Sequence, residues 1–140
     1  MFLEGCFIKS GASGKAGGYS EDVLKKAVED FNKHKDEYSK FGSFGDRDNA
    51  EIGISVPMGE ITHEVVDVSI EHGDLFGKIQ LLDTPKGKIV KEMLNVGAEF
   101  EVAPLVEFDD SGNIEIKRYD IVPKERGVLG TTLKPKDDND

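Results

Sequence analysis

Few residues of this chain have the types and spacing that catalysis or metal binding requires. The sequence contains three histidines, His34, His63 and His72, and one cysteine, Cys6. No two of these four lie at the spacing of zinc ligands. The acidic run "DRDNAE" (46–51) resembles half of a calcium loop but lacks its glycine and terminal glutamate at the required positions. We therefore expect no metal and no cofactor.

His63 and the segment "NVGAEFEVAPLVEF" (95–108) attract most attention. His63 begins an apolar stretch directly after a loop, where a side chain can face a groove. The second segment follows a helix and alternates apolar with other residues, as a strand does. Its alternation places Phe100, Val102, Pro104, Val106 and Phe108 on one face. We expect a strand here.

The bulk composition narrows the classes of function. The chain has 140 residues, 28 acidic against 18 basic, and a formal charge of −10. Such a charge repels nucleic-acid phosphates, so we expect protein partners and no nucleic acid. No apolar run is long enough to cross a membrane. The apolar run in the opening "MFLEGCFIKSG" is too short for a signal peptide, so we expect synthesis in the cytosol.

Helix signals appear twice. Ser20 is a good N-cap for a helix through residue 38, whose apolar stripe is Val23, Leu24, Ala27, Val28 and Phe31. Thr84 and Pro85 begin a second helix, and Gly97 ends it. We expect its apolar side to pack on a sheet; this side comprises Ile89, Val90, Met93 and Leu94.

Strands make up most of the rest. Residues 1–9, 61–82, 95–108 and 114–123 read as strands, and Gly73 suits the turn of a hairpin within 61–82. Simple alternation puts His63, Val65 and Ser69 on one face of that hairpin and Val66 and Val68 on the other. We expect one α+β domain over 1–130, a curved sheet or barrel flanked by two helices. Residues 131–140 read as a polar, disordered tail.

Several segments in order resemble one family. The most specific is the Leu-Asp-Thr-Pro-x-Gly-Lys run inside "GKIQLLDTPKGKIVKEML" (77–94). The others are "GYSEDVLKKAVEDF" (18–31), "FGSFGD" (41–46), "ITHEVVDV" (61–68) and "YDIVP" (119–123). Together they are similar to the prohead maturation serine proteases of tailed bacteriophages, whose fold is like that of herpesvirus assemblin. The resemblance covers roughly residues 5 to 125 and matches His63 to the family's catalytic base.

The chain departs from that family where the nucleophile should stand. After the second helix the family has Gly-x-x-x-Gly-Val-Ser-Ser-Arg-Gly; here Ala103 and Pro104 replace the two serines, and Leu105 and Val106 replace the arginine and glycine. Asp46-Arg47 also replaces an earlier His-Pro. Alanine has no hydroxyl to activate, and proline has no N–H to offer an oxyanion. None of Ser43, Ser55, Ser69 and Ser111 occupies the family position.

The resemblance and its departures together favour a pseudoenzyme. We expect a non-catalytic virion protein, an auxiliary or decoration component of the capsid, made in the host cytoplasm and bound to capsid proteins, with oligomers on the lattice. Two alternatives remain: an active protease with a displaced nucleophile, and a pseudoprotease assembly factor. Leu105 and Val106 either extend the core or form an apolar contact with a capsid neighbour.

Overall fold

The computed structural model describes residues 1–11, 19–34, 41–44, 58–108, 110, 114–127 and 131–136. In chain order the main elements are β1 (Phe2–Ile8), α1 (Glu21–His34), β2 (Phe41–Ser43), β3 (Ile61–Glu71), β4 (Asp74–Leu81), α2 (Pro85–Asn95), β5 (Phe100–Phe108), β6 (Ile114–Pro123) and β7 (Lys134–Lys136). Short 3-10 turns occupy Met58–Glu60 and Lys124–Arg126.

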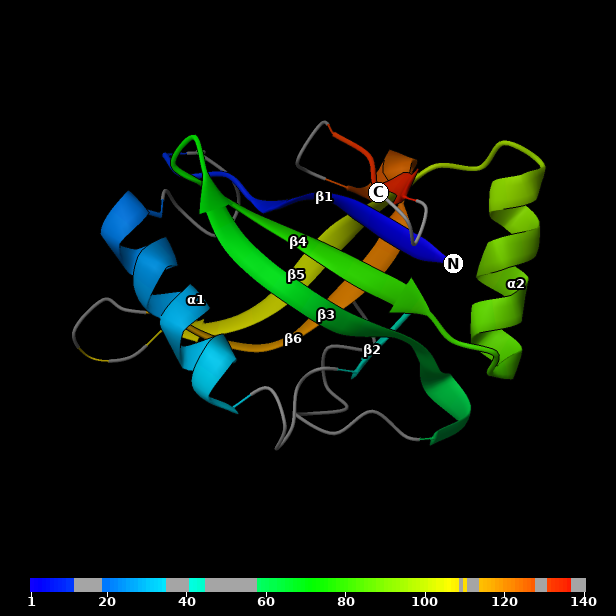
Figure 1. The fold of residues 1–140 in the computed structure, drawn as a ribbon, viewed down its shortest axis with the longest axis horizontal. Helices are drawn as coiled ribbons and strands as arrows, with labels where there is room; N and C mark the ends of the chain where they lie inside the picture. Colours follow the sequence, from blue (N-terminus) through cyan, green and yellow to red (C-terminus); the bar gives the residue numbers. More distant parts are fainter. Residues whose placement is uncertain are drawn as a thin grey trace.

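The strands form two antiparallel sheets. The larger has the order β2-β3-β4-β1-β7, and the smaller pairs β5 with β6. Figure 1 shows β3 and β4 crossing over β5 and β6, with α1 and α2 at opposite ends of the strands. Single contacts join the sheets: a bridge between Phe44 and Ile121, and a hydrogen bond from the Leu133 N–H to the Phe100 carbonyl. The α+β class is confirmed, and the described strands form two sheets, not one closed barrel.

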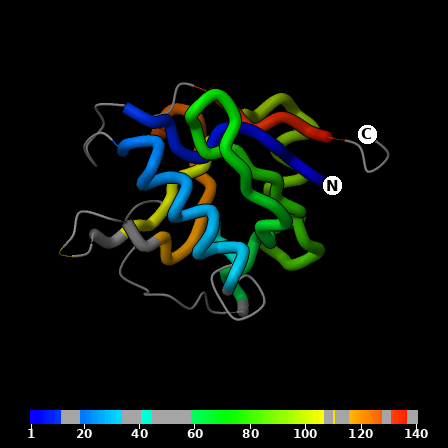
Figure 2. Tube along the Cα trace, turned by 60° about the vertical axis from the view of Figure 1, so that its left-hand side comes forward, coloured from blue at the N-terminus to red at the C-terminus, as the bar shows by residue number. Residues whose placement is uncertain are grey.

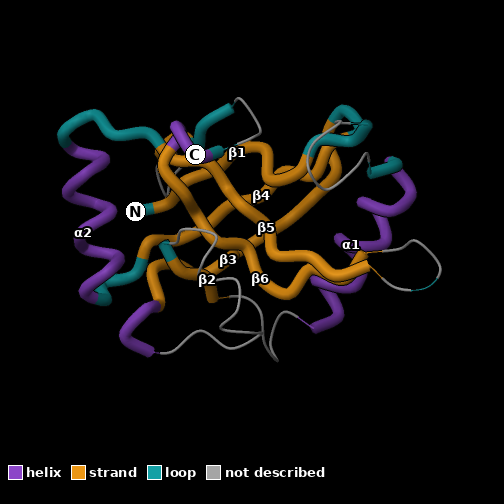
Figure 3. The backbone as a smooth tube through the Cα atoms, turned by 180° about the vertical axis from the view of Figure 1, so that it is seen from behind, coloured by secondary structure: helices purple, strands orange, loops and turns teal. Residues whose placement is uncertain are grey.

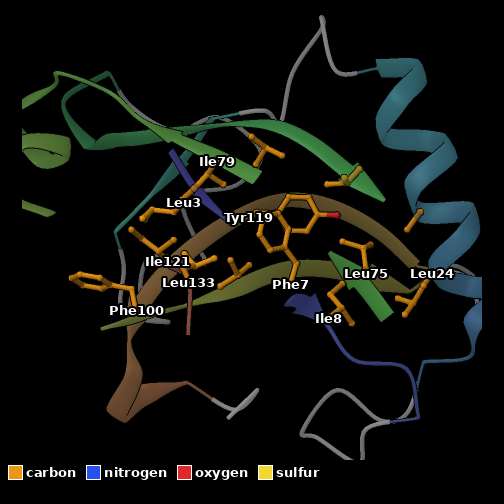
Figure 4. Packing of buried hydrophobic residues seen from close by; sticks show 14 of the residues in the cluster. Leu3, Phe7, Ile8, Leu24, Leu75, Ile79, Phe100, Tyr119, Ile121 and Leu133 are labelled. Carbon is orange, nitrogen blue, oxygen red and sulfur yellow. The ribbon is translucent and has the colours of Figure 1, made fainter. Parts of the chain in front are cut away.

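The core lies between the two sheets and under α1. Its side chains come from both sheets and from the helix, and Phe7 packs against Tyr119 with ring centroids 5.0 Å apart (Figure 4). On α1, Leu24 and Ala27 are buried, and Val23, Val28 and Phe31 pack against them, as the apolar stripe predicts. Residues 35–38 of the predicted helix lie outside the described residues.

Local signals define α2 correctly, but its orientation differs from our expectation. Thr84 caps the helix by accepting a hydrogen bond from the Gly87 N–H, and Gly97 follows the helix with a φ of +98°. Val90 is buried and Leu94 packs on the core. Ile89 and Met93, however, are exposed, so the expectation that all four apolar residues pack on the sheet is wrong.

Two alanine variants test this orientation of α2. Leu94→Ala should lower the free energy of unfolding by about 2 kcal/mol, because it removes methyl groups from the packed side of the helix. Ile89→Ala should change the free energy of unfolding by no more than about 0.5 kcal/mol, the range of surface substitutions. Urea denaturation of both variants measures the two effects. Equal losses would show that α2 is rotated relative to this structure.

A β-bulge changes which residues of β3 face the core. The pairing of β3 with β4 shifts register between Val65 and Asp67, so one residue is left over. As a result Val65 and Val68 are both buried, while Val66 is 40% exposed. The simple alternation expected for this strand is therefore wrong. His63 and Ser69 do not share a face, and Ser69 is exposed.

The segment after residue 130 is also more ordered than expected. Leu133 is buried, and Lys134–Lys136 form β7, which pairs with β1 at the edge of the larger sheet. Figure 2 shows these two segments side by side. The expected disordered tail is thus wrong as far as Lys136, and residues 137–140 lie outside the described residues.

Candidate functional site

His63 lies near the start of β3 and is completely buried. Its Nε2 is 2.6 Å from the carbonyl oxygen of Tyr119 in β6. A carbonyl can only accept a hydrogen bond, so Nε2 must carry the proton and donate it. Within the described part of the chain, Nδ1 has no hydrogen-bond partner. The ring is therefore held in one tautomer and does not face a groove, contrary to our expectation from the sequence.

Gly42 makes this arrangement possible. It lies opposite His63 in the pairing of β2 with β3. A Cβ atom at Gly42 would collide with the Tyr119 carbonyl oxygen and with the His63 ring. Only a residue without a side chain lets the three strands β2, β3 and β6 approach so closely. The glycine thus fixes the position of the imidazole.

Burial lowers the pKa of His63 below its ordinary value of 6.5, because the interior disfavours the charged ring. The hydrogen bond to Tyr119 and the nearby Asp120 carboxylate act in the opposite direction but do not outweigh burial. His63 is therefore neutral in the folded protein at neutral pH.

The lowered pKa of His63 predicts that the folded protein loses stability in acid. The unfolded chain takes up a proton at His63 below pH 6.5, whereas the folded chain resists it. Stability should be full above that pH and fall below it, by at most about 1.4 kcal/mol per pH unit. His63→Gln keeps a neutral donor and should have a shallower fall. Denaturation between pH 5 and 7.5 measures the difference; parallel curves for both proteins would contradict a buried neutral His63.

The position that the resemblance assigns to the nucleophile lies on β5. In the pairing of β5 with β6, Ala103 is opposite Asp120 and Pro104 is opposite Tyr119. His63 contacts the carbonyl of Tyr119, and Ala103 is opposite Asp120, the next residue of β6. The two positions, 40 residues apart in sequence, thus contact neighbouring residues of the same strand.

A buried charged cluster surrounds this point. Arg118 is fully buried, and its Nε donates to Asp120 Oδ2 at 3.0 Å. The other oxygen, Asp120 Oδ1, accepts a hydrogen bond of 3.0 Å from the Ser43 N–H. Because residues opposite each other share a face, Ala103 points to the same side as Asp120, and Leu105 to the same side as Arg118.

Sequence reasoning missed this cluster. Arg118 and Asp120 lie two residues apart in the segment "KRYDIV", so a strand must place both on one face. Two opposite charges two residues apart, on the same face of the strand as Val122, were the signal for a buried ion pair. The pairing with β2 was not visible, since Ser43 is 77 residues away from Asp120.

The other serines considered as nucleophiles differ in their environment. Ser43 is buried, and its Oγ has no hydrogen-bond partner among the described residues. Ser69 is exposed on β3. Ser55 and Ser111 lie outside the described residues, as do Asp46 and Arg47. Ser43 is thus the serine that the structure brings nearest to the cluster through Asp120.

Leu105 and Val106 have different environments. Val106 packs against the core, and the register of β5 shifts between the two residues. Leu105 lies on the other face, opposite Arg118, and is half-buried. Of the pair, Val106 thus belongs to the core, and Leu105 does not pack against it.

Other features add no further chemistry. In the described ranges no group of three His, Cys, Asp or Glu side chains could hold a metal ion. Neither described helix is long and apolar enough to cross a membrane. An open groove of about 830 Å³ lies over β1, β3, β4 and β7, is lined by both lysines and carboxylates, and does not include His63. Burial raises the pKa of Cys6 to about 11, so its thiol is not activated.

The comparison with solved structures shows a likeness of fold to a phage capsid protease. The structure is similar to that of the bacteriophage T4 capsid assembly protease, gp21, with a TM-score of 0.57. The match covers 86% of this chain and 76% of the phage protein, at 15% sequence identity. At that identity the likeness concerns the fold alone. No protein-family model matches the sequence, and no curated protein matches it significantly.

Proposed function

We propose that this chain is a non-catalytic component of a bacteriophage capsid that uses a prohead-protease fold. The likeness to a phage capsid assembly protease supports a capsid-related role. The observation that carries the non-catalytic part is Ala103. It has no hydroxyl, and the resemblance assigns its position to the nucleophile; it lies opposite Asp120, the residue after the Tyr119 whose carbonyl accepts from His63.

The surrounding chemistry also disfavours acyl transfer. A serine protease needs an activated hydroxyl, a base that can accept its proton, and N–H donors for the oxyanion. His63 Nε2 already donates to Tyr119, which leaves only the buried Nδ1 to accept a proton. Pro104 removes one backbone N–H next to Ala103. The hydroxyl, the base and the oxyanion donors are therefore all lost or weakened. Substituting one residue would not restore all three.

The proposed partners are capsid proteins. Leu105 offers a half-buried apolar side chain on β5. The formal charge of −10 would draw the protein towards basic patches and make the attachment weaker at high salt. The proposed location is the virion, and the proposed site of assembly is the host cytoplasm.

One alternative has a specific observation in its favour. Among the described residues the buried Oγ of Ser43 has no hydrogen-bond partner, and the Ser43 N–H donates to Asp120, whose charge acts on His63. Serine, histidine and aspartate thus meet in one region, the residue types of a hydrolytic triad. A protease using Ser43 would have to open this region, because Ser43 and His63 are both buried. An assembly factor that leaves the particle is a further alternative.

Incubation with capsid and scaffold proteins tests the non-catalytic proposal. We expect no specific cleavage by the parent protein. His63→Ala and Ser43→Ala serve as controls for a displaced nucleophile. Cleavage by the parent that disappears in both variants would overturn the proposal and assign the chemistry to Ser43. Cleavage that persists in both would indicate a contaminating protease, and a repeat with further purified protein would then decide.

A further inference from the structure

β2 is a short strand at the edge of the larger sheet, next to β3 and β6 (Figure 3). It has three residues, Phe41–Ser43, against 11 in β3 and 8 in β4. Its pairing with β3 shifts register between Gly42 and Ser43. On the side of β6, the Ser43 N–H donates to Asp120 Oδ1 at 3.0 Å. A short edge strand opens at a lower free energy than longer strands paired on both sides. β2 is therefore the strand around His63 that can leave first.

The backbone of β2 covers one edge of the His63 ring. Gly42 lies opposite His63, and a Cβ atom there would collide with Nε2 and Cε1 of the ring. On its other sides the ring is held by longer strands, since Nε2 donates to the Tyr119 carbonyl of β6 and Leu81 of β4 is the opposite residue. Removal of β2 is thus the smallest rearrangement of these strands that admits water to the ring.

The closed structure has no place for a positive charge on His63. A second proton must go to Nδ1, which is buried and has no partner among the described residues. The charged groups next to the ring lie on β6: Asp120, whose charge acts on His63, and Arg118, which pairs with Asp120. The residues opposite His63 on β2 and β4 carry no charge. Glu64, the next residue of β3, points to the other side of that strand.

We propose that protonation of His63 releases β2 from β3 and β6 while the rest of the fold stays closed. Release lets water solvate the imidazolium, which the interior disfavours. It also breaks the hydrogen bond from the Ser43 N–H to Asp120, so the carboxylate is free to face the positive ring. Ser43, only 2% exposed in the closed form, becomes accessible. The first effect of acid is therefore a local opening where the two sheets meet, before global unfolding.

The pH window follows from the two states of His63. In the open form the ring meets water and has its ordinary pKa of 6.5, whereas burial lowers its pKa in the closed form. The open form therefore binds the proton more tightly. Its population relative to the closed form grows as the pH falls below 6.5, by up to about tenfold per pH unit. Above pH 6.5 neither form takes up the proton, and opening does not depend on pH.

Amide hydrogen exchange, followed by NMR from pH 7.5 to pH 5 and corrected for the intrinsic pH dependence of exchange, tests the release. The N–H groups of Ser43 and Phe44, hydrogen-bonded at 3.0 and 2.9 Å, report on β2. The Leu133 N–H, bonded to β5, reports on the other joint between the sheets. Protection of Ser43 and Phe44 should fall by up to about tenfold per pH unit below pH 6.5, and protection of Leu133 should stay constant.

Two variants assign the effect to His63. His63→Gln should make the protection of Ser43 independent of pH, because glutamine does not titrate. His72→Asn is the matched control and should behave like the parent, since His72 is exposed in the β3–β4 turn and asparagine tolerates its φ of 53°.

Three results would overturn the proposal: constant protection of Ser43 in the parent, equal losses at Ser43 and Leu133, or the same pH dependence in His63→Gln as in the parent. NMR titration of the His63 ring nitrogens in the parent decides the case in which His63→Gln does not fold. Protonation of the ring and loss of Ser43 protection must then follow the same pH dependence, and separate pH dependences would contradict the coupling.

Discussion

Asp120→Ala should destabilise the protein by about 3–5 kcal/mol, among the largest effects of any single substitution in this chain. Arg118 is fully buried, and its Nε donates to Asp120. Removing the carboxylate leaves a guanidinium without that partner in the interior. It also removes the acceptor of the Ser43 N–H, which loosens β2 from β6. Urea or thermal denaturation, followed by circular dichroism, measures the loss.

Asp83→Ala is the matched control for this variant. Asp83 pairs with Lys91 on the surface, so the substitution removes an ion pair without burying a charge. We expect no resolvable change in the denaturation midpoint. The denaturation midpoint of Asp120→Asn should lie between those of Asp120→Ala and Asp83→Ala, since asparagine keeps hydrogen-bond capacity but loses the charge. Equal stability of Asp120→Ala and Asp83→Ala would contradict the buried cluster.

Gly42→Ala should cost about 3 kcal/mol or more, although it adds a single methyl group. The new Cβ would collide with the backbone oxygen of Tyr119 and with the His63 ring. The backbone oxygen cannot move without displacing β6, so the protein cannot adjust cheaply.

Gly59→Ala provides the comparison for Gly42→Ala. A Cβ at Gly59 meets no described atom within 4 Å, and its φ is not positive. Its substitution should therefore leave the midpoint unchanged or raise it slightly. If Gly42→Ala were as stable as Gly59→Ala, the His63 ring could not lie against Tyr119 as described here.

Local chemistry made much of the fold predictable from sequence. Thr84, Pro85 and Gly97 mark the ends of α2 because caps and positive φ depend on neighbouring residues only. The α1 stripe follows from helical periodicity, and the hairpin turn from Gly73. Such signals need no knowledge of which strands pair.

What could not be predicted depends on contacts between distant segments. Pairing with β4 creates the bulge in β3, and the bulge decides which side His63 and Ser69 face. On α2, Ile89 and Val90 are only about 100° apart around the helix, so periodicity alone cannot say which of them faces the sheet. The pairing of Lys134–Lys136 with β1 likewise depends on a strand at the other end of the chain.

Only part of the candidate site could be predicted from the sequence, because the rest also depends on contacts between distant segments. His63 and Ala103 could be singled out by type and by resemblance, and in the structure His63 contacts Tyr119 while Ala103 is opposite Asp120. Their environment could not be foreseen, because burial of His63 depends on β2, β3 and β6 together. The groove expected in front of His63 is absent from the described region around it, and a glycine, a carbonyl and an ion pair surround it instead.

The central proposal, a non-catalytic capsid component, is tested most directly by counting this protein in mature particles. Quantitative mass spectrometry of purified virions gives the ratio of this chain to the major capsid protein. We predict intact chains in a fixed, simple ratio to the capsid lattice, the same in every preparation. Absence from mature particles, or a few copies in a variable ratio, would contradict the proposal and favour an assembly factor or protease that leaves the shell.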